Sequence, residues 1–369
     1  MKNTIGSSFM VTLFGESHGE AVGAVIDGLA PGIRIDSGFI SSQLELRRPY
    51  GKISTPRREK DEFRIVSGIY DGVTTGTPVC IIIPNTSQNS SDYTANRGAA
   101  RPGHADYTAF IKYHGHEDFR GGGHFSGRIT AALTAAGAVA LTALKGKNIK
   151  IGTHISRLGG VSDRALSQDI DDLNEEIALL NGKRFAVLDE NAAEAMEKAV
   201  LSAADDGDSV GGVLETAVTG LPAGIGEPWF DTIEGVLAHG LFSIPGIKGV
   251  QFGGGFDLAD ARGSEFNDPL YIEDGKIFSR TNNNGGVNGG ITNGMPVLFR
   301  CAVKPTPSIR KEQETVDLLR KEGTVISTGG RHDPAIIHRA RVVVDSMAAI
   351  ILCDMLALRY GTDWFSEDN

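Results

Sequence analysis

Residues 126–144 read SGRITAALTAAGAVALTAL, an apolar run made mostly of small side chains. Its length and composition predict one long helix, and small side chains let such a helix pack closely against a sheet. The most apolar part, Ile129 to Leu144, is shorter than the roughly 20 residues that a membrane span needs, and threonines interrupt it. We therefore expect a buried helix at the centre of a globular fold.

Strand and helix patterns alternate on both sides of this run. We expect strands at 9–14, 21–26, 63–67, 79–84, 149–155, 209–218 and 294–303, a surface loop at 85–101, and helices at 37–46, 163–180, 191–204, 232–238 and 336–358. Asp189 or Asn191 is a plausible helix cap, and Gly361 a stop signal. Because hairpin-like glycine turns mix with helices, the pattern predicts α/β or α+β layers, with helices packed on largely antiparallel sheets. No Gly-x-Gly-x-x-Gly follows the first strand, so a dinucleotide-binding fold is not indicated.

The composition excludes several classes of protein. The chain has 369 residues, 40% hydrophobic and 22% charged, which is typical of a packed globular protein, and its net charge of −10 argues against nucleic-acid binding. Cys80, Cys301 and Cys353 form no Cys-x-x-Cys pair, which argues against a disulfide framework or a thiolate zinc site. The N-terminus lacks the apolar region of a signal peptide, so we expect a cytoplasmic protein with no membrane partner.

Glycines and basic residues gather in short segments. Gly accounts for 48 residues, clustered at 121–123, 253–255, 285–290 and 329–330, where the backbone either approaches a ligand or makes tight turns. Only Glu59 opposes the basic residues of the 47–60 window, which are Arg47, Arg48, Lys52, Arg57, Arg58 and Lys60. Arginine matches carboxylate and phosphate oxygens two at a time, so the window predicts an anion site, although a solvated loop remains an alternative.

Histidines lie in two segments. His18 sits between glycines in GESHG, where it is either a general acid or base or a structural histidine. His104, His114, His116 and His124 are interleaved with arginines at 101–128, at spacings that fit no standard zinc pattern. Because the arginines would repel a cation, we favour an anion or cofactor site over a metal site, with backbone N–H groups of residues 121–126 facing a phosphate.

Two motifs near the C-terminus complete the set of candidates. In residues 304–308, KPTPS, the prolines fix a turn that offers the hydroxyls of Thr306 and Ser308. In residues 329–334, GGRHDP, Asp333 is either a cap ahead of the last helix or a proton acceptor beside Arg331 and His332.

Together the motifs resemble the chorismate synthase family. The matching segments span nearly the whole chain and are GESHG (15–19), LRRPYGKISTPRRE (46–59), RPGHADYT (101–108), FRGGGHFSGR (119–128), GEPWFD (226–231), SIPGIKGV (243–250), NGGVNGGITNG (284–294), VKPTPS (303–308) and GGRHDP (329–334). The resemblance implies a single β-α-β sandwich domain over residues 1–369, assembled as a homotetramer. It also implies a lyase that converts 5-enolpyruvylshikimate 3-phosphate to chorismate and phosphate. This 1,4-anti elimination is the last step of the shikimate pathway and requires reduced FMN without net redox change.

The resemblance also implies roles for residues. His18 is similar to the histidine that donates a proton toward the departing phosphate, His104 to the one that supports the reduced flavin, and Asp333 to the carboxylate beside flavin N5. Arg48 resembles a substrate or nicotinamide-site arginine, and Arg47, Lys52 and Arg128 are further expected substrate ligands. The implied flavin-binding positions are His124, Phe125, Ser126, Pro245, Gly246, Gly289, Lys304, Pro305, Thr306, Pro307, Ser308 and Arg331. No metal is expected.

The chain departs from the family pattern at a few positions. Many members have Arg and Glu where this chain has His124 and Ile129, and an arginine about where it has Lys52. Two readings compete with the lyase: a metal-dependent hydrolase built on the histidines, and a non-catalytic flavin- or phosphate-binding protein. Whether NADPH or an external flavin reductase reduces the FMN stays open.

Overall fold

Two antiparallel sheets form the outer layers of the fold. The computed structural model describes residues 2–55, 60–86, 98–327 and 333–366. The first sheet has the order β1-β2-β3-β7-β4, with bounds Thr4–Ile5, Met10–Gly15, Ala21–Asp27, Val79–Pro84 and Arg64–Ser67. The second has the order β11-β16-β10-β8-β9, with bounds Ile247–Phe252, Val297–Val303, Gly212–Thr219, Lys150–Leu158 and Val161–Ser162. Neighbouring strands are antiparallel in both sheets, as the sequence predicted.

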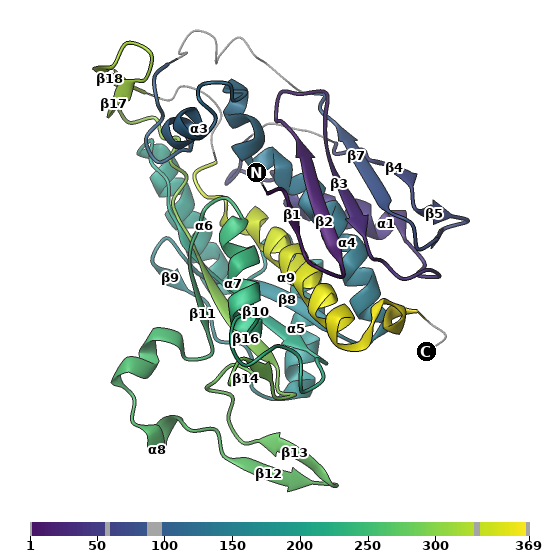
Figure 1. Cartoon of the computed structure of the whole chain (residues 1–369). Helices are drawn as coiled ribbons and strands as arrows, with labels where there is room; N and C mark the ends of the chain where they lie inside the picture. Colours follow the sequence, from purple (N-terminus) through teal and green to yellow (C-terminus); the bar gives the residue numbers. More distant parts are fainter. Residues whose placement is uncertain (1, 56–59, 87–97, 328–332, 367–369) are drawn as a thin grey trace.

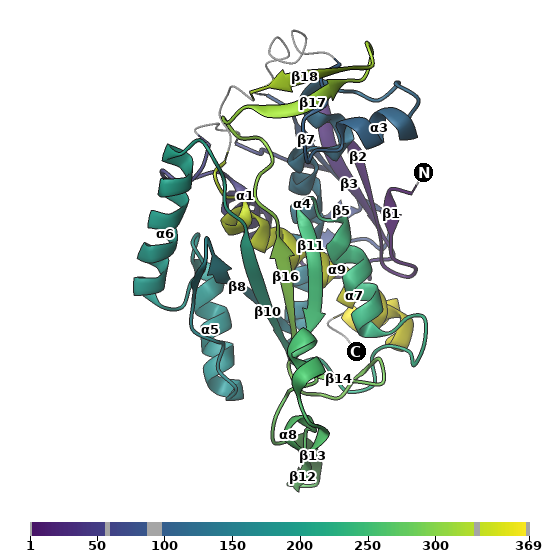
Figure 2. The same cartoon turned by 90° about the vertical axis from the view of Figure 1, so that its left-hand side faces the viewer.

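Helices lie between the two sheets (Figure 1). The layer contains α1 (Ser37–Arg47), α4 (Thr130–Gly146), α7 (Ile233–Ser243) and α9 (Ile337–Tyr360). Helix α4 packs on the first sheet, α9 packs on β8 and β10, and the two helices contact each other extensively. On the other face of the second sheet, α5 (Ile170–Gly182) covers β8, with α6 (Glu190–Asp205) beside it (Figure 2). The result is the expected β-α-β sandwich.

The apolar run that the sequence placed at the centre of the fold is a core helix. Most residues of α4 are fully buried, including Leu133, Val139 and Leu144. The described helical stretch Gly127–Gly146 has the length and hydropathy of a membrane span, but 72% of that window is buried inside the protein. Its hydrophobicity is therefore used for packing between the sheets.

Some element boundaries differ from those expected. The predicted helix 163–180 begins only at Ile170, because the Asp169 side chain caps it by accepting from the amides of Asp171 and Asp172. Residues 161–162 pair instead as β9. The predicted helix at 126 begins as α4 at Thr130, after a 3₁₀ turn over Gly127–Ile129 that Ser126 caps. Asp189 caps α6 as expected.

Several short elements lie outside the sandwich. They are β5 (Ile69–Tyr70), β6 (Val73–Thr74), α3 (Asp106–Lys112), β14 (Val287–Asn288), β15 (Ile291–Thr292), β17 (Gln313–Asp317) and β18 (Glu322–Ile326). Residues 255–280, here called the arm, hold η3 (Gly255–Asp260), α8 (Gly263–Phe266), β12 (Leu270–Glu273) and β13 (Lys276–Ser279). The arm projects from one end of the molecule, and α3, β17 and β18 lie at the opposite end (Figures 1 and 2).

The cysteines are structural, as the sequence indicated. All three are free thiols, with Cys301 and Cys353 buried and Cys80 partly buried. Burial raises the pKa of Cys301 to about 12, so this thiol stays protonated and unreactive at neutral pH.

Candidate functional site

His18 lies in the tight turn between β2 and β3. Its ring is buried, and Ser17 Oγ lies 3.0 Å from its Nδ1 atom. The same hydroxyl donates to the carbonyl of Arg120 at 3.1 Å. Because a carbonyl only accepts and a hydroxyl has one proton, Ser17 must accept from Nδ1–H of His18. The turn therefore fixes both the orientation and the tautomer of the imidazole.

The glycine segment, residues 120–125, packs against this turn. Gly121, Gly122 and Gly123 all have positive φ, which only glycine adopts readily. A Cβ on Gly121 would lie 2.2 Å from Cε1 of His18, so the backbone packs directly against the imidazole. The Ser17 amide donates to the Gly123 carbonyl at 3.1 Å, and His124 Nδ1 donates to the Gly15 carbonyl at 2.7 Å.

The glycine segment offers fewer free amides than the sequence suggested. The Gly122 amide bonds to Phe119 O and the Ser126 amide to Gly123 O, both at 3.4 Å. Ser126 caps the following turn through its hydroxyl, and Phe125 is exposed and packs edge-on against Tyr113. The segment thus acts first as a support for His18.

A second group forms where three loops meet. His104 Nε2 lies 2.6 Å from Ser308 Oγ, and Lys304 Nζ donates to the Gly103 carbonyl at 2.5 Å. The Lys304 amide also donates to the Gly246 carbonyl at 2.9 Å. Burial and then Lys248 lower the pKa of Lys304 below its usual value. The structure therefore brings together His104, residues 304–308 and the Pro245–Gly246 turn.

A third group, here called the arginine cluster, surrounds Asp61. The Asp61 carboxylate accepts from Arg47 Nη2 at 2.7 Å and from Arg128 Nη1, and Arg48 Nε lies 3.9 Å away. The Asp61 side chain has no exposed area. Burial would raise the pKa of Asp61, but Arg47 and Arg128 outweigh it and hold the pKa below its ordinary value. Sequence reasoning missed this carboxylate, because nothing in the local pattern marks Asp61 as buried.

Asp333 binds the arginine cluster through Arg339 rather than capping α9. One carboxylate oxygen accepts from the Thr55 amide at 2.9 Å, and the other accepts from Arg339 Nη2. The N-cap of α9 is Ile336, which makes no side-chain cap bond. The charges of Arg47 and Asp61 both act on Arg339, so the ion pair and the arginine cluster share one electrostatic environment.

Asn85 connects the His18 turn to the arginine cluster. Its amide nitrogen donates to the Glu16 and Gly19 carbonyls, each at 2.9 Å, and its oxygen accepts from Arg128 Nε at 2.8 Å. On the other side, the guanidinium of Arg101 lies against Gly122, and Arg101 pairs with Asp106 in the loop that carries His104. The three groups are thus one continuous set of contacts.

The arginine cluster carries unused donors and an excess of positive charge. Within the described residues, Nε of Arg47, of Arg48 and of Arg339 is buried without a hydrogen-bond partner. Among the described residues, Arg47, Arg48 and Arg128 lie around the carboxylate of Asp61, and Arg339 pairs with Asp333. A buried donor without a partner costs about 1–3 kcal/mol, so this arrangement suits an anionic ligand.

A cavity of about 770 Å³ opens beside the arginine cluster. Arg48, Lys60, Asp61, Glu62 and Phe63 line part of it, and Ser37 and Ser41 of α1 line another part. The histidines do not line this cavity, so the part of the site around His18 and His104 lies apart from it.

Two expected site residues stand apart from these groups, and a third lies outside the described residues. Lys52 is exposed, and no side-chain contact holds it among the described residues. Gly289 lies in the turn between β14 and β15, where neighbouring Gly290 accepts from the amide of Ile233 at the start of α7. Gly246 follows the other end of this 11-residue helix, about 16 Å away. Arg331 lies outside the described residues, as do Arg57, Arg58 and His332.

No metal site emerges from the histidines. Across the described ranges, no three His, Cys, Asp or Glu side chains are grouped so that they could hold a metal ion. His104 and His124 bond to separate partners, Ser308 and the Gly15 carbonyl.

The fold and the site together define an α+β sandwich protein with a concentration of guanidinium groups at one place in an acidic chain. A family model described as "Chorismate synthase" matches residues 9–357. A chorismate synthase of Methanobrevibacter smithii is 47% identical over 355 residues, covering 96% of both chains, and one of Thermococcus kodakarensis is 44% identical over 354 residues, covering 96% of this chain and 97% of the other. A crystal structure titled "Crystal Structure of Chorismate Synthase" superposes with a TM-score of 0.78 at 28% identity, covering 97% of this chain and 94% of that chain. The chain belongs to the chorismate synthase family.

Proposed function

We propose that this protein converts 5-enolpyruvylshikimate 3-phosphate to chorismate and phosphate by a 1,4-anti elimination that requires reduced FMN. This reaction is the last step of the shikimate pathway towards aromatic amino acids, and we place the enzyme in the cytoplasm. Family membership over residues 9–357 supports the proposal. The observation that carries it is the arginine cluster, whose buried unbonded donors lie beside Asp333 and reach the His18 turn through Asn85.

The charge of the substrate matches the arginine cluster. The phosphate and two carboxylates of the substrate need several cationic donors. Arg48 is the best candidate for direct contact, because its side chain is 29% exposed and lines the cavity. Arg47 and Arg128 each donate one bond to Asp61 and contribute positive charge, and Nε of Arg47 has no partner among the described residues. Lys52 would add a mobile point charge.

We assign proton delivery to His18. Since Nδ1–H bonds to Ser17, proton delivery to the departing phosphate oxygen would come from Nε2–H of the doubly protonated imidazolium form of His18. The contact of Gly121 with the imidazole keeps that nitrogen at a fixed position. Burial excludes water from the donor, so its proton would go to the substrate.

We assign flavin binding to the loops around His104. His104, Lys304, Ser308 and the Pro245–Gly246 turn are mutually bonded and form one face of the proposed flavin site. The reduced flavin supplies transient electron density to the substrate, which makes the C–H bond easier to break. Residues 124–126 and 305–307 would add contacts, and Asp333 would hold its carboxylate toward the flavin. Arg331 stays a further predicted contact, and Gly289 would reach a flavin only from another subunit.

The assay is anaerobic conversion of the enolpyruvyl substrate with FMN and dithionite. We expect chorismate and phosphate in equal amounts, and no product when flavin is omitted. Phosphate release that is unchanged without flavin would show that the mechanism is wrong. Supplying NADPH in place of dithionite then tells whether the protein reduces FMN itself or needs an external flavin reductase.

Single replacements test the three assigned groups. We expect His18→Ala, His104→Ala and Asp333→Asn to lower turnover about 10²–10⁴-fold, with smaller changes in substrate binding. Lys198→Ala, which removes an exposed side chain on α6 with no assigned role, is the matched control and should retain the wild-type turnover. Full activity in all three variants would overturn the assignments.

We further propose that the protein assembles as a homotetramer. On the arm, Ile272 is 74% exposed and Ile277 67% exposed, and Phe230 in the 226–231 loop is 95% exposed. An isolated two-stranded hairpin with such a surface is marginally stable in water, so a second copy of the chain is the expected cover. Light scattering should show four subunits for the native protein and fewer for Ile272→Asp. Lys276→Glu, an exposed charge change on the same hairpin, should leave the mass unchanged.

A further inference from the structure

Asp333 is held by two donors from separate parts of the chain. The Thr55 amide donates to Oδ1 at 2.9 Å and Arg339 Nη2 donates to Oδ2. Only 10% of the Asp333 side chain and 21% of the Arg339 side chain are exposed. An ionised carboxylate has about four lone-pair positions, so one position on each oxygen remains after its bonds with the described residues are counted. The two bonds thus fix the orientation of the Asp333 carboxylate without occupying all of its acceptor positions among the described residues.

Residues in the first turn of α9 hold the Asp333 carboxylate and the segment at residues 54–55. Arg339 is a residue of α9, and its neighbour His338 accepts or donates a 2.7 Å bond with Ser54 Oγ. Burial, with a smaller contribution from Arg339, lowers the pKa of His338 to about 3, so this imidazole is neutral. His338 and Arg339, two consecutive residues of α9, therefore hold Ser54 and Asp333, and Asp333 in turn binds Thr55 within the basic 47–60 window.

The charge of Arg339 interacts with two carboxylates and one arginine. Asp333 and Asp61 favour its charge and Arg47 opposes it, while its Nε has no partner among the described residues. Its bond to Asp333 therefore depends on the planar, rigid fork of the guanidinium, which directs the Nη2 donor to one oxygen. A lysine would supply the charge but not the same direction.

We propose that Arg339 is a positioning residue that aims the Asp333 carboxylate into the reaction site. The proposal rests on the proposed function, because it assigns the effect of Arg339 on turnover to the bond that its Nη2 donates to Asp333. It predicts that the effects of changing the two residues on turnover are not independent.

The test is a double-mutant cycle on kcat, with Asp333→Asn, Arg339→Met and the double variant assayed anaerobically with reduced FMN. We expect Arg339→Met to lower kcat about 10²-fold while KM and the FMN Kd change less than about 3-fold. The double variant should be no slower than Asp333→Asn by more than about 3-fold. Arg339→Lys should recover about 10-fold of the loss, because it restores the charge without the fork.

The control is Leu352→Ala, which opens a cavity in the buried face of α9 without touching Asp333. It should lower the Tm but leave kcat per folded molecule unchanged. The proposal fails if the two kcat losses multiply in the double variant, or if Arg339→Met loses activity only in proportion to its unfolded fraction. If Arg339→Met does not fold, Arg339→Lys alone decides, since a wild-type kcat would contradict the proposal. A wild-type protein that makes no chorismate would instead overturn the proposed function.

Discussion

His18 depends on a residue that has no side chain. Gly121 has φ +59, and the space where its Cβ would sit is occupied by Cε1 and Nδ1 of the imidazole at 2.2 and 2.5 Å. The glycine therefore meets two requirements at once, the left-handed backbone and the close contact with the ring. The triple glycine is needed for the geometry of a neighbouring turn as well as for a ligand.

Gly121→Ala should displace the imidazole. We expect kcat to fall about 10–10²-fold with little change in flavin affinity, since a displacement of about 1 Å costs this much in a positioned group. Gly127→Ala is the matched control, because its Cβ would meet nothing within 4 Å and its φ is ordinary. Steady-state kinetics give kcat for both variants, and flavin titrations give their FMN affinities. Equal kcat values for the two variants would contradict the assigned contact.

The sequence identified the residues with recognisable chemistry and missed those that hold them. His18, His104 and Asp333 stand in short motifs, so they could be found before any fold was known. Asp61, Asn85 and Arg339 carry no local signal. The Asp61 bond to Arg128 spans 67 residues and the Asn85 bond to Arg128 spans 43, so only the tertiary structure reveals them.

At the scale of elements, α4 and α9 fit together through small residues. A Cβ on Gly137 of α4 would lie 2.1 Å from Cβ of Ser346 on α9, so the helix backbones approach more closely than larger side chains allow. The sequence predicted a closely packed helix from its small residues but not its partner, because composition does not say which surface a helix meets.

Gly137→Ala should destabilise the protein by about 1–3 kcal/mol through overpacking of this contact. Gly146→Ala, at the end of the same helix, meets nothing within 4 Å and should be neutral or stabilising by about 0.4–1 kcal/mol. Urea denaturation of the pair measures both effects. If the urea midpoint of Gly137→Ala equals that of the wild type, the two helices do not approach this closely.

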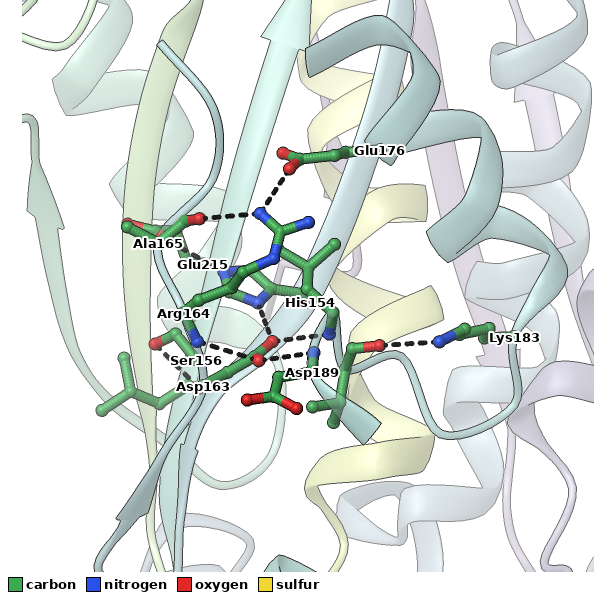
Figure 3. Close-up of polar contacts among 12 residues, drawn as sticks. His154, Ser156, Asp163, Arg164, Ala165, Glu176, Lys183, Asp189 and Glu215 are labelled. Carbon is green, nitrogen blue, oxygen red and sulfur yellow. Dashed lines mark hydrogen bonds and ion pairs between the residues drawn. The ribbon is translucent and has the colours of Figure 1, made fainter. Parts of the chain in front are cut away.

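A buried imidazole connects the strands of the second sheet. His154 on β8 lies 2.9 Å from Asp163 on one side and 2.9 Å from Glu215 on the other (Figure 3). Arg300 on β16 donates to Glu215 at 2.7 Å. Burial opposes the charge of His154, but the bonds to Asp163 and Glu215 outweigh it and raise the pKa of the imidazole. Asp163 also accepts from the Leu188 amide at 2.7 Å, which orders the loop ahead of α6.

This network makes stability depend on pH in a defined direction. Because the pKa of His154 is higher in the folded protein, its stabilisation is complete below about pH 6.5 and is lost as pH rises through the folded pKa. His154→Gln should therefore be most destabilising near pH 6, by about 3–5 kcal/mol, and less so near pH 9.

Chemical denaturation of wild type and His154→Gln at both pH values measures the difference. Arg164→Gln, which removes a half-exposed ion pair with Glu176 in the same region, is the control and should show no such pH dependence. A destabilisation by His154→Gln that is the same at both pH values would contradict a charged His154.

The sequence predicted the boundaries of the helices less accurately than their presence. Asp163 has the character of a helix cap, and the predicted helix 163–180 began there, yet its carboxylate bonds to His154 and to loop amides instead. Asp169, six residues later, makes the cap. Both aspartates are plausible caps locally, and the buried histidine 9 residues away decides between them.

At the scale of the whole molecule, the two sheets and their helices bring distant motifs to one site. Arg128 lies in the 3₁₀ turn that precedes α4, Arg47 ends α1, and Arg339 lies in the first turn of α9, so the ends of three inner helices converge on Asp61 and Asp333. The antiparallel sandwich could be predicted from the strand pattern and the family resemblance. The convergence could not, because it depends on how the helices are stacked between the sheets.

The direct test of one shared site is the anaerobic absorption spectrum of reduced FMN bound to the protein, recorded with and without the enolpyruvyl substrate. If the histidines, Asp333 and the arginine cluster enclose flavin and substrate together, the substrate should perturb the flavin spectrum in the wild type and much less in Arg48→Ala. If both ligands bind and the spectrum of the mixture equals the sum of the spectra of its components, flavin and substrate do not share one site.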